Sequence, residues 1–252
     1  MKIVLLGSGN VATHLGKALM QSGHEIVQVW SRSAAHAREL AEKLDADFTS
    51  QLISLNSDAD LYILSVNDDA ILNVASGFNL KEKILIHTSG TTRLDIPNIS
   101  GVLYPVQTFS KQKDVDFASI PVVVEAVDDK TTELLLSLAQ SITSQVSVLN
   151  SDQRIALHVA AVFACNFSNH LYAIAAKILK DKNIDWELLK PLILETAQKV
   201  QTILPSSAQT GPAIRNDKTT MNRHLELLKS DPSLELIYQS LSQSIINLNQ
   251  KA

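Results

Sequence analysis

The chain has 252 residues, a formal net charge of −4 and a single cysteine. This length allows a sizeable core and two domains. A nearly balanced charge offers no basic patch for nucleic acid, and one cysteine cannot form an internal disulfide, which favours the reducing cytoplasm. The N-terminal apolar run is too short for a signal peptide, and no stretch is expected to be long and apolar enough to cross a membrane.

The first fourteen residues contain an apolar run, a glycine turn and the start of a helical pattern. This order matches the Gly-x-Gly-x-x-Gly/Ala fingerprint of dinucleotide-binding proteins. Its first glycine permits a tight turn, the second lets the backbone approach a pyrophosphate, and the third position (Ala12) brings helix and strand close together. A plain strand-to-helix turn is the alternative. The predicted pyrophosphate contacts are Gly7, Ser8, Gly9, Asn10 and Val11.

A second cofactor contact is predicted about 20 residues after the glycine turn, at Ser31, Arg32 and Ser33. This is where the side chain that reads the adenosine ribose is expected. A carboxylate there would favour NAD, whereas a guanidinium flanked by hydroxyls suits the 2′-phosphate of NADP. The alternative is a solvent-exposed arginine near a helix N-terminus. NADP (NADPH) is therefore the predicted cofactor.

Apolar runs alternate with helical patterns up to residue 150, which predicts an α/β domain with a parallel sheet, the dinucleotide-binding (Rossmann) domain 1–150. Helices are expected at 31–44 and 130–144. Strands are expected at 25–30, 61–66, 83–87, 101–104, 121–126 and 145–149.

Three loops follow strands of this sheet, at the edge where open α/β folds bind their ligands. There are three alternative interpretations. Asn67 only caps the next helix, Thr88 to Gly90 only form a turn, and His87 is a core histidine. In these loops, the residues predicted to contact the cofactor are Ser65, Val66, Asn67 and Thr88. Those predicted to contact the substrate are Ser89, Gly90, Gln107 and Thr108.

Beyond residue 150 no strand is expected, so 151–252 is predicted to be an all-α domain for substrate binding and dimerisation. Asn150 and Gln153 have the spacing of a capping box for the first helix. Helices are expected at 150–180, 185–204 (stopped by Pro205), 218–229 and 232–248.

The first of these helices is apolar on nearly all faces between residues 155 and 179, which indicates burial on more than one side and a homodimer through the helical domain. At about 100° per residue, His158, Asn166 and Asn169 fall within an arc of roughly 80°. They are the catalytic candidates together with Ser89; an internal hydrogen-bond network is the alternative. Cys165 is expected to be buried.

Arg215 lies in the loop 210–217, where it could bind an anionic substrate or pair with Asp217. The histidines show neither His-x-x-x-His nor cysteine-rich spacing, so no metal site is predicted.

Four motifs carry a resemblance over essentially the whole chain: Gly-Ser-Gly-Asn-Val-Ala at 7–12, His-Thr-Ser-Gly at 87–90, Pro-Val-Gln-Thr-Phe at 105–109, and Gly-Pro-Ala-Ile-Arg-Asn-Asp at 211–217 with His224. The chain resembles the Rossmann-like proteins that carry the domain of unknown function 2520, which are described as NADP oxidoreductases. It is more distantly similar to pyrroline-5-carboxylate reductase and to the β-hydroxyacid and 6-phosphogluconate dehydrogenases. These relatives are dimers through a helical domain, with the active site between domains.

The chain also departs from those relatives. The hydroxyacid dehydrogenases use a lysine on the first long helix of the second domain, and here no lysine precedes Lys177 on that helix. The resembled family has Arg-Gly-Asp where this chain has Arg215-Asn216-Asp217, and a histidine in place of Tyr104.

The first hypothesis is an NADP-dependent oxidoreductase that moves a hydride between nicotinamide and a small carbonyl, imine or hydroxyacid in an interdomain cleft. A non-catalytic NADP(H)-binding sensor or scaffold is the second, which the missing lysine favours. A different nucleotide ligand is the third.

Overall fold

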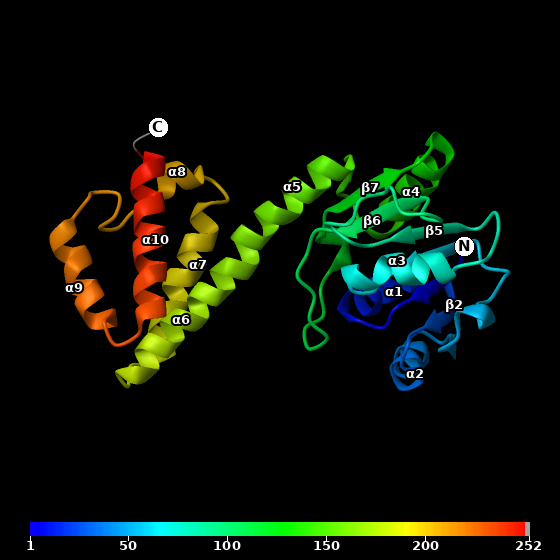
Figure 1. Ribbon diagram of the computed structural model, residues 1–252, viewed down its shortest axis with the longest axis horizontal. Helices are drawn as coiled ribbons and strands as arrows, with labels where there is room; N and C mark the ends of the chain where they lie inside the picture. Colours follow the sequence, from blue (N-terminus) through cyan, green and yellow to red (C-terminus); the bar gives the residue numbers. More distant parts are fainter. Residues whose placement is uncertain (250–252) are drawn as a thin grey trace. The chain divides into compact units, whose positions relative to one another are not determined.

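The computed structural model describes residues 1–249 (Figure 1). Contacts within the chain divide it into two compact units, Met1–Asn166 and Phe167–Ala252. The first contains the sheet, and in the second the regular elements among the described residues are all helices. The predicted boundary at residue 150 marks the change in composition, while residues 151–166 group with the sheet by contacts.

The sheet of the first unit has eight strands in the order β3-β2-β1-β4-β5-β6-β7-β8. All neighbouring strands pair in parallel except β6 and β7, which are antiparallel. The expected parallel sheet is confirmed, with a short additional strand, β3, at one edge. The strands are β1 Lys2–Leu6, β2 Glu25–Trp30, β3 Asp47–Thr49, β4 Leu61–Leu64, β5 Ile84–His87, β6 Gly101–Pro105, β7 Val122–Ala126 and β8 Val146–Val148.

Helices cover both faces of the sheet, because the central strands are apolar on both sides. Every residue of β4 is buried, and in β1 only the first is exposed. Ile3 and Leu5 belong to the core cluster that contains residues of α1, α2 and α4, whereas Val4 and Leu6 belong to the cluster that contains residues of α3. The helices are α1 Asn10–Gln21, α2 Ala34–Lys43, α3 Asp68–Gly77, α4 Asp129–Ile142 and α5 Ser151–Ala161, with short 3₁₀ turns at Leu52–Ser54 and Phe117–Ser119.

The start of α5 confirms the predicted capping box. The backbone N–H of Gln153 donates to Asn150 Oδ1 at 2.9 Å, and the N–H of Asn150 donates to Gln153 Oε1 at 3.1 Å. Two orphan N–H groups at the helix end are thereby satisfied. The first turns of α5 also pack on the sheet, since Leu157 lies against the cluster of Val102, Tyr104 and Val123.

A π-helical turn, Val162–Phe167, follows α5 and precedes α6, Ser168–Asp181. A π turn winds more residues per turn than an α-helix does. The rotation of 100° per residue is therefore not kept between His158 and Asn166. The arc calculated from the sequence for His158, Asn166 and Asn169 does not apply, and this part of the prediction is corrected.

The second unit contains helices only among its described residues, as expected. The predicted helix 185–204 is a 3₁₀ turn followed by an α-helix that ends at Lys199, before Pro205, and Pro205 begins a further short helix. Proline suits the first helical turn, where its missing N–H has no partner to lose. The helices after α6 are a 3₁₀ turn Trp186–Leu189, α7 Lys190–Lys199, α8 Pro205–Ala208, α9 Lys218–Leu228 and α10 Pro232–Asn249.

Apolar side chains of the helix Ser151–Asp181 remain exposed in the single chain, including Val159 and Leu171. Cys165 is exposed as well, which corrects the expectation of a buried thiol. By length and composition the helix could cross a membrane, with a mean hydropathy of 1.3 over its most apolar window. The expectation that no stretch has such a length is therefore wrong, although a core helix of a non-membrane protein meets the same criterion.

Candidate functional site

The glycine turn has the geometry that its sequence predicts. Gly7 has φ +133°, and a Cβ atom there would lie 2.0 Å from the carbonyl oxygen of Ser65, so only glycine fits. Gly9 is the N-cap of α1, and no heavy atom lies within 4 Å of the position of an added Cβ. The space beside the N-cap of α1 is therefore open, and the free N–H groups of a helix N-terminus suit an anionic group.

A cavity of about 360 Å³ opens at this turn. It is lined by eight of the predicted cofactor residues and by five that sequence reasoning did not select. The predicted ones are Gly7, Ser8, Gly9, Ser31, Arg32, Ser65, Val66 and Asn67; the additional ones are Trp30, His36, Ala70, Val74 and Lys111.

The lining of this cavity contains basic side chains and no carboxylate. Arg32 follows β2, His36 lies in the first turn of α2, and Lys111 comes from the loop after β6. Ser8 Oγ donates a hydrogen bond to Ser31 Oγ at 3.1 Å. This arrangement is complementary to phosphate groups. A larger hollow of about 560 Å³ runs along α10, but its lining comes from that helix alone and contains no titratable side chain.

The remaining predicted cofactor residues do not line the cavity. The Asn10 side chain donates to the carbonyl oxygen of Phe109 at 2.9 Å, so its amide is engaged in holding a loop. Val11 is half-buried in α1. Ser33 caps α2, where its hydroxyl accepts from the N–H of His36.

A chain of contacts leads from the cavity to the loop after β5. Ser65 lies against Gly7, and the hydroxyl of Thr88 donates to Ser65 Oγ at 3.3 Å. Ser89, the next residue, is buried, and its hydroxyl accepts from the N–H groups of Thr91 and Thr92. The side chain of Ser89 therefore shapes the loop.

The rings of Tyr104 and His158 lie over this loop. The Tyr104 hydroxyl is 3.0 Å from His158 Nδ1, and a Cβ atom on Gly90 would lie 2.5 Å from that nitrogen. Gly90 therefore lets the pair approach the backbone. Burial raises the pKa of the Tyr104 phenol, against a smaller effect of the Arg154 charge, so the hydroxyl keeps its proton at neutral pH.

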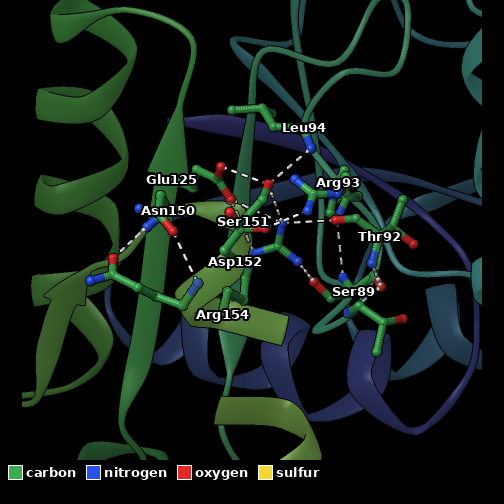
Figure 2. Close-up of polar contacts among 12 residues, drawn as sticks. Ser89, Thr92, Arg93, Leu94, Glu125, Asn150, Ser151, Asp152 and Arg154 are labelled. Atoms are coloured by element: carbon green, nitrogen blue, oxygen red, sulfur yellow. Dashed lines mark hydrogen bonds and ion pairs between the residues drawn. The ribbon is translucent and has the colours of Figure 1, made fainter. Parts of the chain in front are cut away.

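A buried ion pair also holds this loop (Figure 2). The Arg154 side chain is fully buried, and its Nη2 lies 2.9 Å from Glu125 Oε2. The guanidinium also donates to the carbonyl oxygens of Ser89 and Thr92, at 2.9 and 2.7 Å. The hydroxyl of Ser151 donates to the other carboxylate oxygen of Glu125 at 2.8 Å. This network connects β7, α5 and the loop that supports His158.

His87 is a buried core histidine. Its Nδ1 accepts from the N–H of Ser89 at 3.1 Å. Desolvation by burial, and then the positive charge of Arg154, lower the pKa of His87 from 6.5 to about 4. Its Nε2 and the indole Nε1 of Trp30 are buried atoms without a hydrogen-bond partner among residues 1–249.

The other candidate residues are not brought to this place by contacts within the first unit. Gln107 and Thr108 are exposed and hydrogen-bond each other. Asn166 is exposed on the π turn. Asn169 and Arg215 are exposed in the second unit, where the charge of Arg215 contributes to the lowered pKa of Asp217, after the hydrogen bonds that Asp217 accepts from Thr220.

Sequence reasoning missed Tyr104, Glu125, Arg154, His36 and Lys111. A signal existed for the ion pair, because one glutamate in an apolar strand and one arginine at the start of an apolar helix need compensation when both are buried. No comparable signal marks Lys111, since its loop is polar and folds back on a helix almost a hundred residues earlier in the sequence. Among the described residues 1–249, no three or more His, Cys, Asp or Glu side chains gather in a way that could hold a metal ion.

Comparison with known proteins gives two family matches. The model of the domain of unknown function DUF2520 matches residues 120–245, which is half of the chain. The model described as "NADP oxidoreductase coenzyme F420-dependent" matches residues 2–90, which include the glycine turn and every residue of the cavity lining except Lys111. No curated protein matches the chain.

Solved structures match over nearly the full length. The "putative NADP oxidoreductase" of Bacteroides fragilis is 44% identical, with a TM-score of 0.92 and 98% of each chain covered. The imine reductase of Myxococcus stipitatus, solved with NADP⁺, is 17% identical with a TM-score of 0.68, covering 100% of this chain and 94% of the other. The 1-pyrroline-5-carboxylate reductase of Streptococcus pyogenes is 17% identical with a TM-score of 0.65, covering 100% and 99%. The predicted fold and family are confirmed, and the expected NADP(H)-dependent oxidoreductase agrees with these names.

Proposed function

This chain belongs to the family of proteins that carry the DUF2520 domain, and we propose that it is an NADP(H)-dependent oxidoreductase acting on a small carbonyl, imine or hydroxyacid. One observation carries the proposal: the glycine turn opens on a cavity that also presents Arg32, with no carboxylate in its lining. A carboxylate at that place would repel a 2′-phosphate, whereas a guanidinium binds it.

The cofactor residues fit a dinucleotide phosphate. The open space at Gly9 leaves room for a pyrophosphate on the N–H groups of α1, and the hydroxyl of Ser31, which accepts from Ser8, adds a donor. Arg32 is the expected partner of the 2′-phosphate. When NADPH is bound, it supplies the hydride for the reaction.

The protein's own part in the reaction is to orient the substrate and to supply a proton. We assign proton donation to His158 at Nε2, because Nδ1 faces the Tyr104 hydroxyl. Ser89 and Gly90 shape the surface beneath this pair. Roles for Asn166, Asn169, Gln107, Thr108 and Arg215 toward the substrate remain part of the proposal.

A second function is favoured by one feature of the sequence. The helix Ser151–Asp181 carries no lysine before Lys177, whereas the resembled hydroxyacid dehydrogenases use a lysine on their corresponding helix. A protein that binds NADP(H) without turning it over, as a sensor or scaffold, would not need one.

The proposal also includes a homodimer through the helical part of the chain and a cytoplasmic location. Val159 and Leu171 are 49% and 38% exposed, and a second copy of the same helix would bury such side chains at low cost. The cytoplasmic location is proposed because a chain with one cysteine forms no intramolecular disulfide and so gains no stability from an oxidising compartment.

A two-step experiment tests the function. Intrinsic fluorescence is titrated with NADPH and NADH on the wild type, on Arg32→Ala and on Arg38→Ala. Arg38 is the matched control, because its guanidinium stacks on Phe48 outside the cavity, 4.9 Å from the ring centre. The expected result is NADPH binding that weakens about 10- to 150-fold in Arg32→Ala, the value of one charge-assisted contact, and is unchanged in the control.

The second step separates the enzyme from the sensor. The protein is incubated with NADPH deuterated at C4 and a set of small ketones, cyclic imines and oxo acids, and the products are analysed by mass spectrometry. Deuterium in a product supports the reductase. NADPH binding without deuterium transfer to any member of the set supports the sensor. Failure to bind either NADPH or NADH would contradict both the reductase and the sensor.

A further inference from the structure

The loop 109–114, which follows β6, is fastened to the first two turns of α1. The carbonyl oxygen of Phe109 accepts from the side chain of Asn10 at 2.9 Å, and Nε2 of His14 lies 2.9 Å from the carbonyl oxygen of Ser110. The rings of His14 and Phe109 stack at 5.2 Å between centres. This loop is therefore held in a defined position beside the glycine turn, although it lies far from it in the sequence.

The loop brings Lys111 to the cofactor cavity. Lys111 lines the cavity together with Arg32 and His36, so the loop after β6 adds a basic side chain to the two that the end of β2 and the start of α2 supply. The lysine side chain is otherwise exposed, and it takes part in none of the ion pairs recorded among residues 1–249. Lys111 therefore adds a positive charge to a cavity whose lining contains no carboxylate.

The charge of Lys111 also acts on a residue of α2. The pKa of Glu39, a residue of α2, is lowered first by its hydrogen bond and charge interaction with Lys43, and then by the charges of Lys111 and His36. Lys111 therefore lies within electrostatic reach of the helix that follows β2. The end of β2 is where this fold reads the adenosine ribose, whereas the pyrophosphate belongs to the glycine turn.

We propose that Lys111 determines cofactor specificity by binding the 2′-phosphate of NADP(H) opposite Arg32. The inference rests on the proposed NADP(H) dependence and adds a residue from the loop after β6 to the recognition of that phosphate. A lysine ammonium is a compact point charge that suits a phosphate monoester, and Arg32 adds a planar donor. NADH has no 2′-phosphate, so its binding does not involve either residue.

The test compares Lys111→Ala with Lys113→Ala, a matched control two residues away in the same loop. The Kd values of NADPH and NADH are measured by fluorescence titration, and those of adenosine 2′,5′-bisphosphate and 5′-AMP by calorimetry. Lys111→Ala is expected to weaken NADPH and the bisphosphate about tenfold or more and to leave NADH and 5′-AMP within about twofold. Lys113→Ala is expected to leave all four within about twofold.

Three results would overturn the inference while the wild type still binds a nicotinamide cofactor. Equal losses for NADPH and NADH would mean that Lys111 contacts the shared pyrophosphate or only shapes the loop, and unchanged NADPH binding would mean that it makes no contact. If the wild type itself bound NADH and NADPH equally well, the 2′-phosphate would not be read and the inference would also fail. Wild-type protein that bound no nicotinamide cofactor would instead overturn the proposed function, and the inference with it.

Discussion

Tyr104 and His158 form a hydrogen-bonded pair, with the phenol oxygen 3.0 Å from Nδ1 of the imidazole. A hydroxyl can either donate to this nitrogen or accept from it, so the bond survives when the imidazole gains or loses a proton at Nε2. Gly90 makes the arrangement possible, because any side chain there would collide with both rings. The two rings can therefore pack directly on the backbone of Gly90.

The first prediction concerns proton donation by His158. With whichever small substrate the wild type reduces, His158→Ala should lower kcat about 10²- to 10⁴-fold, the usual contribution of a positioned general acid. The Kd of NADPH should stay within about twofold, because His158 does not line the cofactor cavity. Steady-state kinetics and the fluorescence titration check the two parts, and a loss in kcat below about tenfold would remove His158 from this role.

Tyr104→Phe is the companion variant. It keeps the ring and removes the hydroxyl, so we expect a smaller loss in kcat and a shifted pH profile, since Nδ1 loses the partner that orients it. A pH profile identical to that of the wild type would show that the hydroxyl has only a packing role.

A second prediction concerns stability. Arg154→Met should lower the free energy of unfolding by about 3–5 kcal/mol, because it leaves the Glu125 carboxylate inside the protein without its partner. Arg93→Met is the control: its ion pair with Asp152 is 54% and 78% exposed, and we expect a change below about 1 kcal/mol.

Urea denaturation measures both values. The double variant Glu125→Gln/Arg154→Met should be more stable than Arg154→Met alone, since the stranded charge is gone. A loss below about 1 kcal/mol for Arg154→Met would contradict the burial of this pair.

The third prediction is a pH dependence caused by His87. Its pKa falls to about 4 in the folded protein, chiefly because burial disfavours the imidazolium form. The unfolded chain therefore binds a proton that the folded chain does not, and stability is lost as the pH falls from about 6.5 to about 4. A shift of about 2.5 pH units corresponds to about 3 kcal/mol.

The variant His87→Asn isolates this effect, since its side-chain oxygen can still accept from the N–H of Ser89. The difference in unfolding free energy between wild type and variant should rise by about 3 kcal/mol between pH 4 and pH 7. A constant difference over that range would show that His87 does not titrate as described.

The fourth prediction concerns assembly. Light scattering of the protein in detergent-free buffer at micromolar concentration should give the mass of a dimer, because the exposed apolar side chains of α5 and α6 would otherwise face water. Val159→Lys should shift the mass toward the monomer, while Val148→Lys, at an exposed apolar position in β8, should not. A monomeric wild type would contradict the dimer, and recovery only with membranes would indicate that the helix enters a bilayer.

The sheet was predictable because its signals are local. The apolar runs Leu61 to Val66 and Gly101 to Tyr104 can bury their side chains and still form all backbone hydrogen bonds only as inner strands of a sheet. The antiparallel pairing of β7 was not predictable, since parallel and antiparallel neighbours need the same apolar residues. The π turn was missed for a similar reason: nothing in Val162–Phe167 distinguishes it from an ordinary helix.

For the site, the sequence by itself determined the residues whose role is local to the chain. The turn at Gly7 and Gly9, Arg32 after β2 and the cap at Asn150 can each be recognised from residues nearby in the sequence, and the cavity contains eight of the predicted cofactor residues. Tertiary structure alone decided the contacts between distant segments. It placed Lys111 at the cavity, paired Tyr104 with His158 and buried Arg154 against Glu125, because these contacts depend on strand order and on the packing of α5, which no local pattern encodes.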